Sequence, residues 1–291
     1  MTSSSATVNT EAVWADLQAP ALERLTDSTD KHAVYGLDPF VREGWASLCG
    51  LLGEAGAYTF ATETGLVWLR PDLVASGGLE RVLVRIEEDG FVVRAARPVV
   101  LDRAGVRGLW WWQLKRATAE RLLLLDAVAE LGPGLLVLYG HPGGRPAERL
   151  TRLKGGNDPQ GRAGDSLRSV AGSENRILTM VHTSDDGADV VRELAVFLPW
   201  QERVALVAAA CRGASGVGRG SGVLGPPVAA VRSACPASAE MTGSPVRSGG
   251  GRERDFTRLM RDLRAPDPAR RWGAVRGWAR QVPQLNDGTA R

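Results

Sequence analysis

A histidine that follows an apolar run is the residue of this chain best placed for covalent chemistry. His182 lies in the segment M-V-H-T-S-D at residues 180–185, and Glu193 follows it by eleven residues. A neutral imidazole can attack a phosphoryl group, and a carboxylate on the next helix can reach back and fix its tautomer and orientation. The alternative is a polar residue whose hydrogen bonds are simply satisfied, as is common for a single histidine after a strand.

Arginine side chains upstream of this histidine could bind the oxygens of a phosphoryl group. Arg70 ends an apolar run and precedes a Pro-Asp step, and Arg168 lies in a Gly-, Asp- and Arg-rich segment at residues 155–173. Phosphoryl transfer depends on positioning and positive charge, and the guanidinium group matches phosphate geometry. Each could instead be a surface arginine, and Arg152 and Arg162 are nearby alternatives.

Alternating strand and helix patterns are expected to position these residues. Apolar and β-branched runs predict strands at residues 65–70, 91–101, 135–139 and 177–181. Helical spacing and breaks predict helices near residues 79–88, 105–115, 117–131, 148–153 and 186–197. This order favours a ferredoxin-like α/β sandwich, with helices on one face of a four-stranded, mostly antiparallel sheet. A loop as long as 155–173 fits such a domain only if it is functional.

Two extensions and a linker are predicted around this domain, which we place at residues 64–200. Residues 1–63 carry helical spacing and are expected to form a helical extension that packs on the domain. Residues 212–252 are rich in Gly, Ser, Pro and Arg, and a flexible linker is predicted at residues 201–252. Residues 253–291 regain helical spacing and are basic, and docking on protein is favoured there over a nucleic-acid contact.

Four short motifs follow one another over some 130 residues of the domain. They are Arg70-Pro71-Asp72, G-G-N-D-P at 155–159, Ser166-Leu167-Arg168, and H-T-S-D at 182–185 with the later Glu193. Together they resemble the Lys-Pro-Asp, Gly-x-Thr-Asn/Asp-Pro, Thr-Ile-Arg and His-Gly-Ser-Asp steps of the nucleoside diphosphate kinase family. The resemblance implies that family's fold. It also implies transfer of the terminal phosphate of ATP or GTP through phospho-His182 to a nucleoside diphosphate or an unusual small-molecule acceptor.

The resemblance also implies roles for individual residues. His182 would be the nucleophile, Glu193 its orienting carboxylate and Ser184 the support of that pair, while Asp72 and Asp185 would be structural. The implied phosphate- and nucleotide-binding positions are Arg70, Arg168, Asn157, Trp111, Thr179 and Arg152. Mg²⁺ is expected to arrive with the nucleotide, bridging its phosphates, with no metal site built from protein side chains. A homo-oligomer is compatible with the resemblance.

The departures from the family pattern lie mainly at the nucleotide contacts. Trp111 stands where the family has a tyrosine, and Ala119 falls near its base-stacking phenylalanine. Losing a stacked ring removes about 1–3 kcal/mol of base binding. Two functions therefore stay open. One is a divergent phosphotransferase, which the set of His182, Ser184 and Glu193 favours, and the other is a catalytically impaired scaffold or regulatory binding protein.

The composition excludes several other classes of protein. A net charge of +3 with 44% hydrophobic and 24% charged residues is ordinary for a globular protein and disfavours nucleic-acid or membrane binding. No apolar stretch approaches the roughly 20 residues that span a bilayer, and the N-terminus does not resemble a secretory signal. Cys49, Cys211 and Cys235 are too scattered for a disulfide framework or a zinc site. We therefore expect a reduced, cytoplasmic protein.

Overall fold

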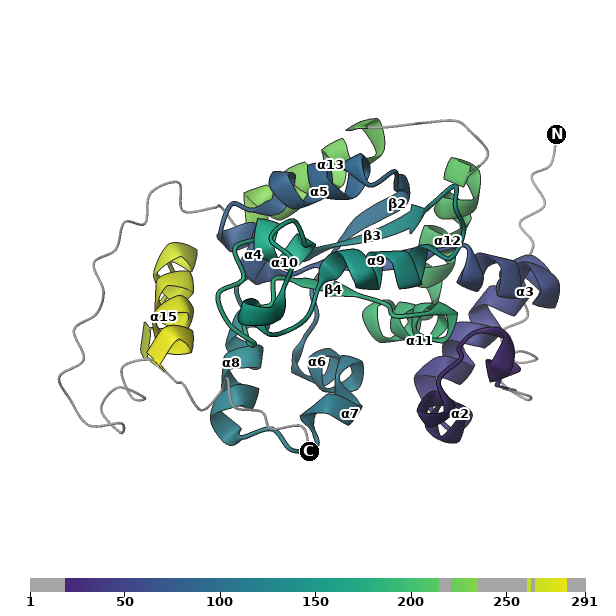
Figure 1. Cartoon of the computed structure of the whole chain (residues 1–291), viewed down its shortest axis with the longest axis horizontal. Coiled ribbons are helices and arrows are strands. Elements are labelled where there is room, and N and C mark those ends of the chain that lie inside the picture. The colour runs from purple at the N-terminus through teal and green to yellow at the C-terminus, as the bar shows by residue number, and fades with distance from the viewer. Residues whose placement is uncertain (1–18, 215–220, 235–260, 263–264, 282–291) are drawn as a thin grey trace.

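A four-stranded antiparallel sheet lies at the centre of the chain, and helices surround it (Figure 1). The computed structural model describes residues 19–214, 221–234, 261–262 and 265–281. The strands are β1 (Gly65–Leu69), β2 (Val92–Val99), β3 (Gly134–Gly140) and β4 (Val181–Thr183). Their order in the sheet is β2-β3-β1-β4, and each neighbouring pair is antiparallel. The predicted ferredoxin-like α/β sandwich is confirmed.

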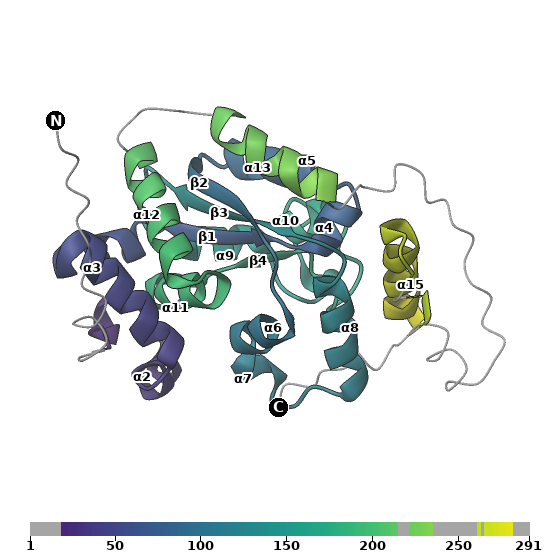
Figure 2. The same ribbon diagram turned by 180° about the vertical axis from the view of Figure 1, so that it is seen from behind.

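Helices cover both faces of this sheet, whereas the sequence pattern predicted cover on one face (Figure 2). On the face of Val67 and Leu69 lie α4 (Pro71–Ala75), α5 (Leu79–Glu88), α10 (Leu167–Val170) and α13 (Ser221–Ala234). On the face of Leu66 and Trp68 lie α3 (Pro39–Thr62), α6 (Arg103–Leu109), α11 (Gly187–Phe197) and α12 (Trp200–Ala214). Every residue of β1 and β3 is buried, which requires packing on both faces.

The remaining short elements connect these layers or lie at their ends. They are η1 (Leu22–Arg24), α2 (Thr29–Tyr35), α7 (Trp111–Leu114), α8 (Ala119–Ala129), α9 (Pro146–Lys154), η2 (Pro159–Gly161) and α15 (Pro268–Gln281). The predicted helical extensions on both sides of the domain are therefore present, while residues 1–18 lie outside the described residues. None of the helices in the described part of the chain is long and apolar enough to cross a membrane.

The fourth strand begins later than the apolar pattern predicted. The prediction placed it at 177–181, but β4 starts at Val181, so His182 lies within the strand and pairs with Trp68 of β1. The preceding segment is buried but irregular, and the side chain of Asn175 accepts its backbone N–H groups at 2.9 Å. An apolar run reports burial, and burial alone does not distinguish a strand from a buried irregular segment.

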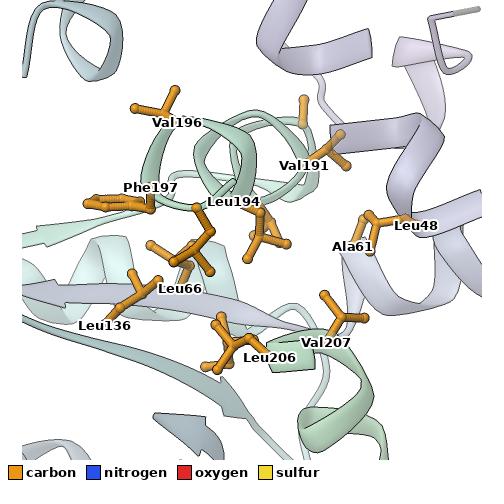
Figure 3. Packing of buried hydrophobic residues seen from close by; sticks show 14 of the residues in the cluster. Leu48, Ala61, Leu66, Leu136, Val191, Leu194, Val196, Phe197, Leu206 and Val207 are labelled. Carbon is orange, nitrogen blue, oxygen red and sulfur yellow. The ribbon is translucent and has the colours of Figure 1, made fainter. Parts of the chain in front are cut away.

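Figure 3 shows the core on the face of Leu66, where α11 packs between the sheet and the N-terminal extension. Side chains from β1, β3, α3, α11 and α12 meet there, and none is more than 6% exposed: Leu48, Ala61, Leu66, Leu136, Val191, Leu194, Phe197, Leu206 and Val207. Every residue of α11 is buried. The helix that follows the turn at residues 184–186 is therefore held in the core along its whole length.

The contact between α3 and α11 is close enough to require glycine at one position. A Cβ atom at Gly44 would lie 2.0 Å from the carbonyl oxygen of Val191. We expect Gly44→Ala to lower the free energy of unfolding by about 1–3 kcal/mol, because overpacking shifts α3 away from α11. Urea unfolding of the full chain measures this. Gly50→Ala, in the same helix with open space around it, is the control. It should raise the free energy of unfolding slightly, by less than about 1 kcal/mol. Equal effects of the two changes would contradict the close packing.

The linker predicted at 201–252 is wrong for the residues that the structure describes. Residues 201–214 belong to α12 and residues 221–234 form α13, while 235–252 lie outside the described residues. Leu206 and Val207 of α12 and Val231 of α13 are buried against the sheet. The many small residues of this region resemble linker composition, but in α12 one of them allows the helix to approach the sheet closely. Gly213 of α12, for example, lies next to the backbone of Arg94 in β2.

The C-terminal helix α15 docks on the segment that leads into β4. Trp272 and Val275 are buried in the core, and Arg276 and Arg280 bind Glu174 at 2.6 and 2.5 Å. The hydrogen bonds from Arg280 and from Arg276 bring the pKa of Glu174 down to about 2, against the opposing effect of burial. The prediction that this region docks on protein agrees with these contacts, and α15 braces residues next to the cavity described below.

Candidate active site

A cavity of about 520 Å³ opens beside β4 and collects most of the residues singled out from the sequence. Its lining includes seven of the nine predicted site residues: Arg70, Arg152, Asn157, Arg168, Thr179, His182 and Glu193. Ser184 and Trp111 do not line it. Segments as distant in sequence as α2, α6–α9, β4 and α11 contribute to the wall. The fold therefore brings together residues that the sequence could only propose one by one.

His182, Glu193 and Ser184 form a chain of hydrogen bonds. The Nε2 atom of His182 lies 2.8 Å from Oε1 of Glu193, and the Ser184 hydroxyl donates to Oε2 of Glu193 at 2.6 Å. Ser184 is fully buried, and the Glu193 side chain is 6% exposed. Because a carboxylate only accepts, the proton of the ring is held on Nε2 and Nδ1 keeps its lone pair. Nδ1 makes no hydrogen bond to the residues that the structure describes.

The His182 ring is also fixed by an aromatic contact. Trp110 packs edge-on against it, with ring centroids 5.9 Å apart at 80°. Just before β4, Met180 has a φ of 60°, a left-handed conformation that is uncommon for a residue with a side chain. The carbonyl oxygen of Met180 accepts the backbone N–H of Arg70 at 3.0 Å, which ties the start of β4 to the end of β1. Both contacts limit the positions that the imidazole can take.

Arg70 is buried at the wall of the cavity and is held from two sides. Its Nη1 donates to the Thr179 hydroxyl at 2.6 Å, and its Nε lies 3.2 Å from Oδ1 of Asp72. The ring of Trp110 lies 5.3 Å from its guanidinium carbon. Burial raises the pKa of Asp72, and the charge of Arg70 opposes that shift. Thr179 therefore orients Arg70, and Asp72 acts on the site through the same arginine.

Arg168 and Arg152 add further positive charge to the wall of the cavity. Arg168 is 7% exposed and donates to the carbonyl oxygen of Gly155 at 2.7 Å. Burial, followed by repulsion from Arg70 and Arg162, lowers the pKa of Arg168 to about 10. Arg152 is exposed on α9 and makes no ion pair with the described residues. A bound anion would relieve the repulsion among these guanidinium groups.

Lys154 is a cavity residue that sequence reasoning missed. It is 9% exposed, and its Nζ lies 3.1 Å from Oδ1 of Asp185, which also accepts from the Thr151 hydroxyl at 2.8 Å. Burial lowers the pKa of Lys154, and Asp185 partly offsets this. A signal was available, because Lys154 follows the buried Ala147 and Leu150 at helical spacing and so falls on the inner face of α9.

The predicted site residue Trp111 points to solvent instead of into the cavity. Its side chain is 55% exposed, and the cavity is lined by its neighbours Trp110 and Trp112. The reason is local: Trp110 is the non-helical residue between α6 and α7, so its side chain turns inward, while Trp111 begins α7 on the outer face. Trp110, rather than the predicted Trp111, is therefore the residue that lines the cavity and contacts His182.

The N-terminal extension also reaches the cavity, which the sequence did not indicate. Lys31 of α2 binds Asp186 at 2.6 Å and Asp189 at 2.8 Å. The Tyr35 hydroxyl donates to the other oxygen of Asp189 at 2.7 Å, and Asp189 accepts the backbone N–H of Asp185 at 3.0 Å. Burial alone would lower the pKa of Lys31, but Asp189 and Asp186 outweigh it and raise the pKa. Helix α2 thus fixes the turn that follows His182.

Comparisons with known proteins agree on one family for the central part of the chain. A family model described as nucleoside diphosphate kinase matches residues 63–203. The nucleoside diphosphate kinase of Rhodococcus erythropolis is 31% identical over 139 residues, which are 47% of this chain and 96% of that protein. That of Pyrococcus horikoshii is 24% identical over 143 residues, covering 48% of this chain and 88% of the relative. A thioredoxin domain-containing protein 3 homolog of Heliocidaris crassispina is 27% identical over 142 residues, and this chain spans only 16% of its length.

Similar solved structures carry the same description. An NDP kinase from Pyrobaculum aerophilum is 18% identical, covers 49% of this chain and 98% of its own, and gives a TM-score of 0.40. A nucleoside diphosphate kinase from Halobacterium salinarum, solved in complex with CDP, is 19% identical, covers 47% of this chain and 88% of its own, and gives a TM-score of 0.39.

Proposed function

The chain belongs to the nucleoside diphosphate kinase family through residues 63–203, and we propose on that basis that it transfers the terminal phosphate of a nucleoside triphosphate by way of His182. The observation that supports this most is the bond between Nε2 of His182 and Glu193 at 2.8 Å. It leaves Nδ1 unprotonated at the wall of a cavity rich in arginine and lysine.

The proposed reaction has two displacement steps. Nδ1 of His182 attacks the terminal phosphorus in line, a P–N bond forms, and the bond from phosphorus to the bridging oxygen breaks, releasing the nucleoside diphosphate. An oxygen of the acceptor then attacks the same phosphorus, and the bonding electrons return to Nδ1. Glu193 keeps the proton on Nε2 and stabilises the positive charge that the ring gains in the intermediate.

The cations of the cavity would bind the oxygens of the transferred group. Arg70 and Arg168 are buried and preorganised by Thr179 and by the carbonyl of Gly155, so they need little rearrangement to receive a phosphate. Lys154 lies at the same wall and adds a point charge. Positive charge fixed before the reaction stabilises the developing negative charge on the equatorial oxygens.

A magnesium ion would be held by the phosphates of the nucleotide, because the carboxylates of the cavity are already paired with other side chains. Asp185 is bound by Lys154, Asp189 by Lys31 and Glu193 by His182, so each already has a cationic or hydrogen-bonding partner. Among the described residues, no cluster of three or more His, Cys, Asp or Glu side chains could hold a metal. Mg²⁺ bound to the phosphates would supply charge neutralisation there. The cytoplasmic location and a homo-oligomeric state stay predictions.

Labelling of the full chain tests the proposed function. Incubation with γ-labelled ATP or GTP and Mg²⁺ should give protein-bound label that is labile in acid and stable in alkali, and nucleoside diphosphates should discharge it. If no nucleoside triphosphate labels the protein, the phosphotransferase proposal fails. The alternative function, a catalytically impaired scaffold or regulatory binding protein, would then account for the domain.

Lys31 provides a test of the part that the N-terminal extension plays in this site. Lys31→Met leaves Asp186 and Asp189 without their cation beside a site that binds phosphates. We expect the affinity for Mg-ATP, measured by calorimetry, to fall by roughly 5- to 30-fold, which corresponds to about 1–2 kcal/mol of added repulsion. The double variant Lys31→Met, Asp189→Asn removes one of the uncompensated charges and should recover most of the affinity. Failure of this rescue, or no loss in the single variant, would show that Lys31 does not act through these charges.

A further inference from the structure

Two arginines at one wall of the cavity have no role in the mechanism above. Arg121 lies in the first turn of α8, and Arg176 lies in the segment before β4. Leu124 and Ile177 are 1% and 2% exposed and pack against each other, which holds the first turns of α8 beside the segment that carries Arg176. The proximity of the two guanidinium groups is therefore fixed by the core.

The two arginines are only partly neutralised. Arg176 binds Asp158 at 2.7 Å, but Arg121 forms no ion pair with any residue that the structure describes. The Nε atom of Arg121 is buried and has no hydrogen-bond partner in the same part of the chain. Burial and then the charge of Arg176 lower the pKa of Arg121. Asp158 thus neutralises Arg176 alone, and Arg121 keeps unused donors at the cavity wall.

This arginine pair is separate from the cations placed around the phosphoryl group. Arg121 comes from α8 and Arg176 from the segment before β4, whereas Arg70 follows β1 and Arg168 belongs to α10. Thr179 lies between Arg176 and His182 in the sequence, and its hydroxyl accepts a hydrogen bond from Arg70. Arg70 is therefore bound closer to His182 along this segment than Arg176 is. The cavity therefore presents one positive group near His182 and a second one near α8. A volume of about 520 Å³ is large enough for a ligand that reaches both.

We propose that the acceptor carries a second anionic group, such as a phosphate on the ribose of a nucleotide, and that Arg121 and Arg176 bind this group while its accepting phosphate lies at His182. The inference rests on the proposed function, because it names the class of acceptor for the same site. Guanidinium groups bind phosphate through paired, charge-assisted hydrogen bonds. An anion between the two arginines would also remove the repulsion that burial imposes on them.

Paired ligands test this subsite in the full chain. Calorimetry would compare ADP with its analogues that carry an additional phosphate on the ribose 2′ or 3′ oxygen. At least one analogue should bind about tenfold more tightly than ADP or better. Arg121→Gln and Arg176→Gln should each reduce this ratio toward one. Arg116→Gln, which changes an exposed arginine outside the cavity, is the matched control and should keep the full ratio.

Two results would overturn the proposal. One is that neither analogue binds more tightly than ADP to the wild-type protein. The other is that Arg121→Gln weakens ADP and the tighter analogue by the same factor, which would mean that the arginine acts on the base or through its general field. Failure of the proposed function is read separately, because it would appear as absence of label from γ-labelled ATP on the wild-type chain, whatever the ratio of affinities.

Discussion

His182→Ala should abolish the acid-labile, alkali-stable label that the wild-type protein is expected to acquire from γ-labelled ATP and Mg²⁺. The variant removes Nδ1, the nitrogen that Glu193 leaves unprotonated, and no second histidine lines the cavity within the described residues. The fold should survive, because the His182 side chain is 14% exposed and lies in a short strand. Circular dichroism of the variant checks this. Label retained on His182→Ala would contradict the assignment of the nucleophile.

Two further variants separate chemistry from general damage. His141→Ala removes a half-buried histidine outside the cavity, whose Nε2 contacts the carbonyl of Asp89, and it should label like the wild type. Glu193→Gln keeps the size of the side chain but loses the charge that holds Nε2–H. A hydrogen bond to a charged group contributes about 1.5–3 kcal/mol, so labelling should slow by roughly 10- to 150-fold without disappearing. A Glu193→Gln variant as fast as the wild type would show that the carboxylate does not position the ring.

Arg192→Leu should lower the free energy of unfolding by about 3–5 kcal/mol, because it leaves a buried carboxylate without its partner. The Nε of Arg192 binds Asp38 at 2.7 Å, and the two side chains are 3% and 6% exposed. Arg192 also donates to the carbonyl oxygens of Gly108 and Leu109 at 2.6 and 3.2 Å. One side chain thus joins α11, the start of α3 and the end of α6. Urea unfolding of the full chain measures the loss.

An exposed ion pair supplies the control for this change. Arg97 binds Glu202 at 2.7 Å with side chains 30% and 47% exposed, and Arg97→Leu should cost no more than about 1 kcal/mol. The double variant Arg192→Leu, Asp38→Asn removes the stranded charge and should recover part of the loss. If Arg192→Leu were no more destabilising than Arg97→Leu, the buried pair would not hold these three helices together.

The central part of the site could be predicted because its residues are close in sequence. A strand, a turn and a helix connect His182, Ser184 and Glu193, so their spacing nearly determines their geometry. The strands at 65–69 and 134–140 were predicted for a similar reason, since both are short apolar runs between breaks. Local patterns carry local structure well.

The contacts that could not be predicted depend on tertiary packing or on the exact residue at which a helix begins. Lys31 and Tyr35 reach Asp186 and Asp189 at the start of α11 from a segment some 150 residues earlier, and no local pattern records that contact. Trp110 and Trp111 differ only in whether the residue falls between two helices or begins one. The helices at 200–214 and 221–234 contain many Ala, Gly and Ser residues, so their composition did not separate them from a linker.

The position of the phosphate in the trapped phosphoprotein tests the central claim most directly. The full chain would be labelled with ATP and Mg²⁺, separated from nucleotide at alkaline pH, and studied by peptide mass spectrometry and by nuclear magnetic resonance of the phosphorylated ring. A single phosphate on Nδ1 of His182 is the expected result, because Nε2 is held by Glu193. Phosphate on Nε2, on another residue, or on no residue at all would contradict the account.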